Sequence, residues 1–312
     1  MSEKIRKKIR KRDALVVSGL GDYSLTDTAL CGQVFSFEEI MRDGEYVEYI
    51  VPIGHLLVTV GQQKRGELIF YGVCDEDFER VVSPFFSLHV DFGAIADKVS
   101  EGYKRDWFTE AVKNARGIAI LKQDAWEALF SFIVSQNNNI PRIKKILRRF
   151  RLEYGKNLAE GLGKCPLGKH GECPSHKACT GCGICYSFPE ATAVVREPEK
   201  LLSANPGFRY RYLVDAARRV ADGKTRLDEI EGAHSYAYSL EELKKIVGVG
   251  DKVASCVALF GLGNLDAFPI DVWMKRAIDT YFDGKLDPAV FGEYAGVAQQ
   301  YIFHYIRNIE NK

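Results

Sequence analysis

The stretch IVGVGDKVASC places a lysine, Lys252, where a glycine turn ends and an apolar helix is about to begin. Two helices joined by such a turn form a helix-hairpin-helix, and glycine permits the positive φ angles that a tight hairpin needs. The N-terminus of the second helix leaves backbone N–H groups free to bind an anion. The turn consists of Gly248, Val249 and Gly250. The pattern therefore predicts a phosphate site, although an ordinary pair of antiparallel helices has the same pattern.

The position of Lys252 favours a reactive amine. At a helix N-terminus the backbone dipoles disfavour the charged ammonium, and so do apolar neighbours. A lysine that loses its proton more easily can attack carbon and form a covalent intermediate. Cys256 follows one helical turn later, so we expect the two side chains to share a face of the helix. An exposed lysine without a catalytic role is the alternative.

A carboxylate follows in the segment DAFPIDVWMKRAI. Pro269 delivers the chain to Asp271, which is a natural N-cap for a helix over residues 272–281. We expect a carboxylate at a helix N-terminus to stay ionised, which would let it stabilise a cationic transition state or transfer a proton. Taken by itself, Asp271 is better explained as a helix cap.

Elements of two kinds must position these side chains. The first third of the chain is rich in β-branched and aromatic residues separated by turn residues, which predicts an antiparallel meander. The expected strands cover residues 45–54, 55–63 and 67–73. From about residue 105 onward the apolar spacing becomes helical.

Three helices are expected around the candidate residues. In the first, residues 124–134, Asp124 and Glu127 match a capping box. The sequence Asn137-Asn138-Asn139 ends that helix, and Pro141 opens the next one. The inward side chains of this next helix are Ile143, Ile146, Leu147 and Phe150. The third helix is expected to start at Ser239 and Glu242 and to end at the glycine turn.

Composition restricts the partners only weakly. The 312 residues suffice for about two domains, and 43 basic against 42 acidic residues leave a net charge of +1. Two basic runs, residues 4–12 and 141–151, are interpreted as solvated helix faces or mobile tails rather than phosphate contacts. No apolar run is long enough to span a membrane, and the basic N-terminus lacks an apolar signal core. We therefore expect an intracellular protein of the cytoplasm or nucleoid.

Five of the eight cysteines are clustered within residues 161–186, a segment without apolar periodicity. Their spacing, C-x7-C-x5-C-x2-C-x2-C, predicts a structural metal site, with zinc favoured over an iron–sulfur cluster. The candidate ligands are Cys165, Cys173, Cys179, Cys182 and Cys185. Reduced thiols without metal are the alternative.

Together these motifs resemble a known family. VGVGDKVASC followed by PIDVWM is similar to the helix-hairpin-helix-GPD DNA glycosylases, and SQNNNIPRI with GFRYRY narrows the resemblance to the eukaryotic-type 8-oxoguanine DNA glycosylases. It extends from Leu30 to Tyr305. The resemblance implies an α+β fold with a TBP-like antiparallel sheet domain over residues 1–110. A helical glycosylase domain follows over residues 111–312, with the cysteine-rich segment 161–186 as an insertion.

The resemblance also implies site residues. Lys252 would be the Schiff-base nucleophile and Asp271 the catalytic carboxylate. The backbone carbonyl of Gly32 would accept the N7–H that oxidised guanine has and guanine lacks. The flipped base would lie between Phe303 and Cys256, with Gln299 at its Watson–Crick edge. On the opposite strand, the resemblance assigns the unpaired cytosine to Asn137, Arg142 and Arg209, and the intercalating wedge to Phe208.

The activity implied is excision of 8-oxoguanine opposite cytosine from duplex DNA, followed by strand cleavage, with no cofactor required for catalysis and a monomer as the active form. Two residues depart from the family pattern: Trp273 replaces a phosphate-contacting histidine, and Phe208 replaces a tyrosine. The phosphate contact at residue 273 is therefore in doubt. A glycosylase for another damaged base, and a non-catalytic DNA-binding module, are the alternatives.

Overall fold

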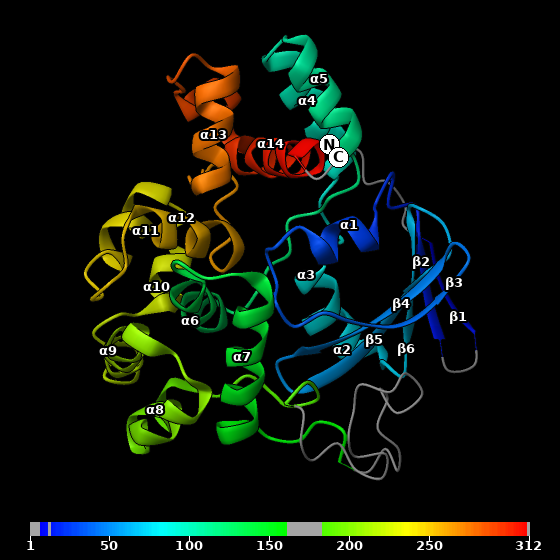
Figure 1. Ribbon diagram of the computed structural model, residues 1–312. Helices are drawn as coiled ribbons and strands as arrows, with labels where there is room; N and C mark the ends of the chain where they lie inside the picture. Colours follow the sequence, from blue (N-terminus) through cyan, green and yellow to red (C-terminus); the bar gives the residue numbers. More distant parts are fainter. Residues whose placement is uncertain (1–6, 12–13, 161–182, 311–312) are drawn as a thin grey trace.

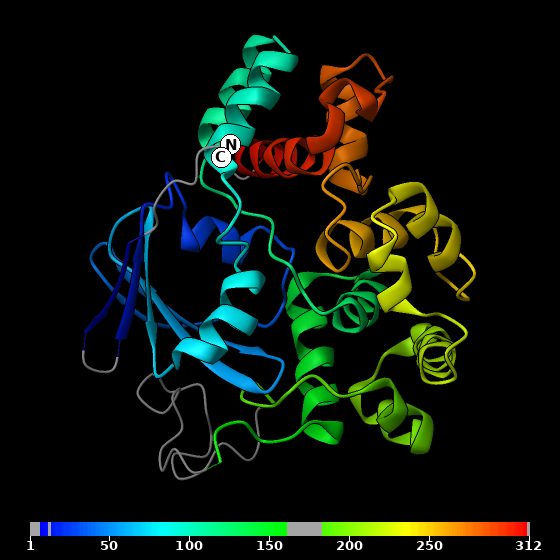
Figure 2. The ribbon, with the colours of Figure 1, turned by 180° about the vertical axis from the view of Figure 1, so that it is seen from behind.

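The computed structural model describes residues 7–11, 14–160 and 183–310. Six strands among them form one antiparallel sheet in the order β1-β2-β6-β5-β4-β3, and helices make up most of the rest (Figures 1 and 2). The α+β class predicted from the sequence is therefore confirmed. None of the helices in these ranges is both long and apolar enough to cross a bilayer.

The predicted meander is confirmed as β4 (Tyr46–Ile53), β5 (Leu56–Gln62) and β6 (Glu67–Tyr71). Three further strands escaped the sequence analysis: β1 (Lys7–Lys11), β2 (Ala14–Ser18) and β3 (Glu38–Asp43).

The interpretation of the N-terminal basic run as a helix face or tail was wrong for β1, which pairs with β2 along its whole length. A strand rich in lysine and arginine is well suited to a sheet edge, because its charges oppose pairing with another chain. Lys8 forms an ion pair with Glu79 and lies over the Phe78 ring.

Short helical elements cover the sheet. They are α1 (Leu25–Leu30), α2 (Asp75–Asp77), η1 (Phe78–Val82) and α3 (Ser83–Phe85). Phe70 on β6 packs edge-on against Phe78 and Phe86, with ring centroids 5.4 and 5.3 Å apart. This aromatic layer fixes the sheet on the segment that leads into the helices.

A buried glutamine fixes the loop that follows α1. Gln33 Nε2 donates to the Ala119 carbonyl at 2.8 Å, and Gln33 Oε1 accepts from the Leu121 N–H at 2.8 Å. The loop containing Gly32 is thereby held on residues 119–121, an extended segment between the sheet and the helices. Gly32 is thus positioned by a side chain that is 1% exposed.

A helical layer lies away from the sheet. Helices α4 (Phe92–Gly102) and α5 (Asp106–Ala115) pack against α14 (Ala295–Glu310), next to α13 (Val272–Tyr281) (Figures 1 and 2). Trp107 of α5 stacks on Tyr281 of α13 with centroids 4.5 Å apart. Residue 110, the predicted domain boundary, lies inside α5, and the division into two domains stays a prediction.

Helix α6 (Ala125–Ser135) is the centre of the second helical group and contacts α7 (Ile140–Tyr154), α9 (Tyr210–Ala221) and α12 (Asp251–Phe260). The predicted cap is present, because Asp124 Oδ1 accepts from the Glu127 N–H at 2.9 Å. Pro141 lies in the first turn of α7, as expected. The remaining elements are α8 (Ala191–Arg196), η2 (Pro198–Ala204), η3 (Gly207–Arg209), α10 (Leu227–Gly232), α11 (Tyr236–Leu243) and η4 (Pro288–Tyr294).

The predicted start of the helix before the glycine turn was wrong. Helix α11 begins at Tyr236 with Ser235 as its N-cap, so Ser239 lies inside the helix. The earlier start lets the Tyr236 hydroxyl meet Ser255 Oγ of α12 at 2.8 Å. Ser239 donates instead to the Ser235 carbonyl at 2.9 Å, a bond that satisfies its hydroxyl within the helix.

Candidate active site

The glycine turn between α11 and α12 has the geometry expected of a hairpin. Gly248 has φ +83°, and a Cβ added there would lie 2.4 Å from Cγ of Tyr212. Gly250 is the N-cap of α12, has extended backbone angles, and has no atom within 4 Å of its would-be Cβ. Val249 is 6% exposed and anchors the turn. The two glycines are therefore required for different reasons.

Replacing Gly248 with alanine should destabilise the protein by more than about 2 kcal/mol, because left-handed backbone strain adds to a clash with the Tyr212 ring. Replacing Gly250 with alanine should cost less than about 1 kcal/mol, since only the cap preference changes. Urea unfolding and duplex-DNA affinity, measured on both variants, check this difference. Equal losses from the two substitutions would contradict it.

The Lys252 side chain extends from the first turn of α12 toward the end of α6. Its Nζ donates to Ser135 Oγ at 3.1 Å and lies 5.2 Å from the centroid of the Phe132 ring. Burial raises the pKa of the Cys256 thiol, and the charge and hydrogen bond of Lys252 oppose that rise, whereas the charge of Asp271 adds to it. Lys252 and Cys256 are one helical turn apart on α12, so their side chains share a face of that helix.

Asp271 caps α13 as predicted, with Oδ1 accepting from the Met274 N–H at 2.9 Å. Among the described residues its carboxylate has no other hydrogen-bond donor, which leaves Oδ2 available. Trp273, in the first turn of the same helix, lies under the Arg276 guanidinium at 5.1 Å from ring centroid to Cζ. The start of α13 thus presents a carboxylate oxygen that the helix cap does not use.

A second group of predicted residues lies where the N-terminal part meets α14. Gly32 has φ +85°, and a Cβ built there would be 4.0 Å from Cε1 of Phe303. Gln299 precedes Phe303 by one turn, is 3% exposed, and accepts from Gln300 Nε2 at 2.7 Å. Arg307 covers the Phe303 ring, with Cζ 5.2 Å from the centroid. A cavity of about 330 Å³ beside Phe303 is lined by Asp27, Leu30, Cys31, His304, Arg307 and Asn308.

Cys256 belongs to the main buried core, and the partly buried Phe303 packs against that same core. No hydrogen bond or ring contact in the described ranges joins Cys256 to Phe303, although the resemblance places a flipped base between them. The base-facing roles of Gly32, Gln299 and Phe303 therefore stay predictions.

The residues predicted for the opposite strand gather at the turn between α6 and α7. Asn137 has φ +45°, and its side chain and that of Arg142 are exposed. Phe208 is 52% exposed, as suits a wedge, and its ring lies 4.4 Å from Cζ of Arg209. Arg209 differs from the rest, because it is only 2% exposed and donates to backbone carbonyls.

Two residues of the site were missed by the sequence analysis. Ser135 holds the Lys252 amine, and Gln136 Nε2 donates to the Gly248 carbonyl at 2.6 Å, which ties α6 to the glycine turn. Their only sequence signal is their position just before the three asparagines, and nothing in their residue type points to a contact with residues more than a hundred positions away.

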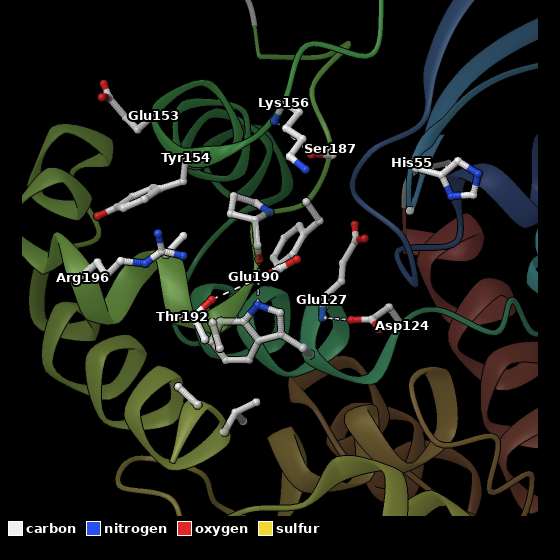
Figure 3. A pocket seen from close by; sticks show the side chains of 18 of the residues that line it. His55, Asp124, Glu127, Glu153, Tyr154, Lys156, Ser187, Glu190, Thr192 and Arg196 are labelled. Atoms are coloured by element: carbon white, nitrogen blue, oxygen red, sulfur yellow. Dashed lines mark hydrogen bonds between the residues drawn. The ribbon is translucent and has the colours of Figure 1, made fainter. Parts of the chain in front are cut away.

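A larger cavity of about 980 Å³ lies among α6, α7, α8 and α9 (Figure 3). Acidic and basic side chains surround it, including Glu127, Glu153, Lys156 and Arg196. None of the residues predicted for catalysis or base recognition lines this cavity. Its size alone does not make it the reaction site.

The predicted metal site falls mostly outside the described residues, as do Cys165, Cys173, Cys179 and Cys182. Cys185 is described and is fully buried beside Ile40, Ile50 and Ile184. No group of three or more potential metal ligands occurs within the described ranges. The metal therefore stays a prediction.

Comparisons with known proteins agree on one family. The model of the 8-oxoguanine DNA glycosylase N-terminal domain matches residues 16–129. The structure of MBOgg1 with a low-affinity DNA ligand is 32% identical, has a TM-score of 0.82, and is aligned over 98% of this chain and 99% of that one. The 8-oxoguanine glycosylase/lyase of Clostridium acetobutylicum, in complex with double-stranded DNA containing cytosine opposite 8-oxoG, is 29% identical over 98% of both chains, with a TM-score of 0.79.

A curated relative extends beyond the aligned region. The N-glycosylase/DNA lyase of Saccharomyces cerevisiae is 33% identical over 262 residues. The match covers 77% of this chain but only 61% of the yeast protein.

Proposed function

We propose that this chain, which belongs to the 8-oxoguanine DNA glycosylase family, excises 8-oxoguanine opposite cytosine from duplex DNA and then cleaves the strand. The observation that carries the proposal is Lys252 in the first turn of α12, directly after the glycine turn, together with Asp271 at the start of the next helix, α13. A nucleophile, a carboxylate and a phosphate-binding turn in one place are what a lysine-dependent glycosylase needs.

The reaction begins once the Lys252 amine has lost its proton. Nζ attacks C1′ of the damaged nucleotide, the C1′–N9 bond breaks, and the base leaves with the bonding electrons and takes up a proton. The C1′–O4′ bond then opens, and a proton moves from nitrogen to O4′, which leaves an imine between Nζ and C1′. The Asp271 carboxylate stabilises the positive charge that develops on the sugar.

Strand cleavage follows from the same imine. The imine makes the C2′ hydrogen acidic, and removal of that proton breaks the C3′–O bond and expels the 3′ phosphate by β-elimination. No cofactor is needed for either step, because the electrons and protons come from the substrate, the amine and water.

Selection of the damaged base is assigned to the second group of predicted residues, Gly32, Gln299 and Phe303. The Gly32 carbonyl accepts the N7–H of 8-oxoguanine, whereas guanine would present a bare N7 lone pair and leave that carbonyl unpaired, at a cost of about 1–3 kcal/mol. The flipped base stacks on Phe303, with Cys256 on its other face and Gln299 at its Watson–Crick edge. In this proposal the base lies between Cys256 and Phe303 and so joins the two groups.

The opposite strand is held at the turn between α6 and α7. Flipping a base costs a few kcal/mol, and a wedge that fills the gap offsets part of that cost. Phe208 is the wedge, and the exposed Asn137 and Arg142 contact the unpaired cytosine.

Replacing Gly32 with alanine should leave the protein folded, since the added Cβ makes only an ordinary contact with Phe303 and the backbone strain is about 1–2 kcal/mol. The methyl group would reduce the space beside the Gly32 carbonyl that the flipped base must occupy. The rate of 8-oxoguanine excision should therefore fall by about 10–200-fold. Single-turnover excision measures this. The rate of covalent trapping at a preformed abasic site should stay at the wild-type value, because that substrate has no base to accommodate. An equal fall in the excision rate and in the trapping rate would exclude a base-reading role for Gly32.

Excision across a panel of lesion duplexes tests the proposed function. The panel contains 8-oxoguanine opposite each of the four bases, an oxidised pyrimidine, an alkylated purine and undamaged DNA. Fastest release of 8-oxoguanine opposite cytosine is expected. Faster release of another lesion would assign a different glycosylase, and salt-sensitive binding without release of any base would assign a non-catalytic DNA-binding module.

A further inference from the structure

Residues 135–137, which we name the linking turn, connect three parts of the site through consecutive positions. Ser135 accepts from the Lys252 amine at 3.1 Å, and the Gln136 side chain donates to the Gly248 carbonyl at 2.6 Å. Asn137 is left-handed and carries one of the side chains assigned to the opposite cytosine. Nucleophile, phosphate turn and opposite-base contact therefore share one short stretch of backbone.

Arg209 holds this turn in place. Its Nε donates to the Gln136 carbonyl at 2.9 Å and its Nη2 to the Asn137 carbonyl at 2.9 Å, with a further Nη2 bond to Gln136. Nη1 donates to the Pro206 carbonyl at 3.1 Å. A guanidinium has five N–H donors, so only one remains for a nucleotide. Most of the hydrogen-bonding capacity of Arg209 is thus used on the protein itself.

The charge environment of the Arg209 guanidinium is consistent with a side chain held in one position. Burial lowers its pKa, and the nearby charge of Arg142 lowers it further. Among the described residues no carboxylate pairs with Arg209, so its charge is balanced by carbonyl dipoles and by the face of the Phe208 ring. A buried cation is tolerated only when its donors are well satisfied, which explains why the backbone carbonyls surround it.

The Ser135 hydroxyl is oriented as well. It donates to the Phe132 carbonyl at 2.8 Å, so its lone pairs are left to accept from Lys252. A displacement of the linking turn would move Ser135, and with it the direction of the Lys252 amine.

We propose that Arg209 is a positioning residue: by clamping the linking turn it sets the Lys252 amine through Ser135, and so couples the opposite-strand contact to the nucleophile. The inference rests on the proposed function and deepens it. It also differs from a direct reading of cytosine by Arg209, because positioning acts even when no opposite base is present.

Borohydride trapping on two duplexes separates the two roles. Both duplexes carry an abasic site that Lys252 can attack. In the first duplex the abasic site is opposite cytosine. In the second it is opposite a tetrahydrofuran residue, which has no base. Arg209→Lys keeps the charge but loses the fork of donors, and it should lower the single-turnover trapping rate about tenfold or more on both duplexes. Arg142→Gln is the contrast, because it should change the ratio of the two rates.

Ser135 variants provide the readout that a purely structural role would not give. Ser135→Ala should lower trapping about tenfold on both duplexes at unchanged DNA affinity, and Ser135→Thr, which keeps the oxygen, should restore most of the rate. If the unfolding curve of Arg209→Lys shows that this variant does not fold, the Ser135 variants still test the link between the linking turn and Lys252.

The possible outcomes separate the two proposals. A fall confined to the cytosine duplex for Arg209→Lys, or full trapping by Ser135→Ala, would overturn the inference and leave the proposed function intact. Absence of trapping by the wild-type protein on every duplex would overturn the proposed function, and the inference with it.

Discussion

Replacing Lys252 with glutamine is expected to abolish covalent trapping on 8-oxoguanine duplexes and to slow base excision at least about 10³-fold. The reason is that Lys252 Nζ is the atom that bonds to C1′ in the proposed mechanism. Glutamine is similar in length and remains polar, but its amide nitrogen is not a nucleophile. The folded structure should change little, because the Lys252 side chain is only partly buried and its replacement removes a single hydrogen bond, the one to Ser135. The unfolding free energy should therefore differ by less than about 1 kcal/mol.

Sodium borohydride reduction followed by denaturing electrophoresis measures the trapped species directly. Lys224→Gln is the matched control, because Lys224 is exposed and pairs with Asp222 at 3.7 Å, and none of the described residues predicted for the site forms a hydrogen bond or ion pair with it. It should trap as the wild-type protein does. A covalent band of undiminished intensity from Lys252→Gln would show that another amine reacts and would remove the basis of the mechanism.

Replacing Asp271 with asparagine should lower the rate of base excision by about 10²–10³-fold, the usual effect of removing one group that stabilises transition-state charge. Asparagine caps a helix about as well as aspartate, so the bond to the Met274 N–H can be kept and stability should hold. Asp271→Ala removes both roles and should cost a further 0.5–2 kcal/mol or so of stability. The two variants therefore separate the charge from the cap.

Single-turnover excision and urea unfolding on both Asp271 variants check this separation. If Asp271→Asn excises 8-oxoguanine at the wild-type rate while Asp271→Ala is merely less stable, the residue is a helix cap and nothing more. That outcome would return Asp271 to the alternative that its sequence position allows.

The elements that carry Lys252 and Asp271 were predictable because their signals are local. A glycine turn followed by a lysine, and an aspartate before a helix, are patterns of a few residues, and both elements are present. The base-facing assignments of Gly32 and Phe303 came only from the family resemblance, since the residues lie at opposite ends of the chain.

Other features depend on long-range contacts that no local pattern encodes. Ser135 looks like any helix-terminal serine until α12 brings Lys252 beside it. The family resemblance assigned Arg209 to the unpaired cytosine, yet its guanidinium is buried against the carbonyls of residues 136 and 137. The strand β1 was missed because lysine and arginine dominate it and only its pairing with β2 makes it a strand.

The contact between Gly32 and Phe303 joins positions that are 271 residues apart, the difference of 303 and 32. Closing so long a loop is entropically slow, whereas residues 236–281 hold the hairpin and the carboxylate within a short range. During synthesis the elements that carry Lys252 and Asp271 can therefore form before Gly32 and Phe303 come together. If these two residues read the base as proposed, discrimination between damaged and normal guanine is the last property that the emerging chain acquires.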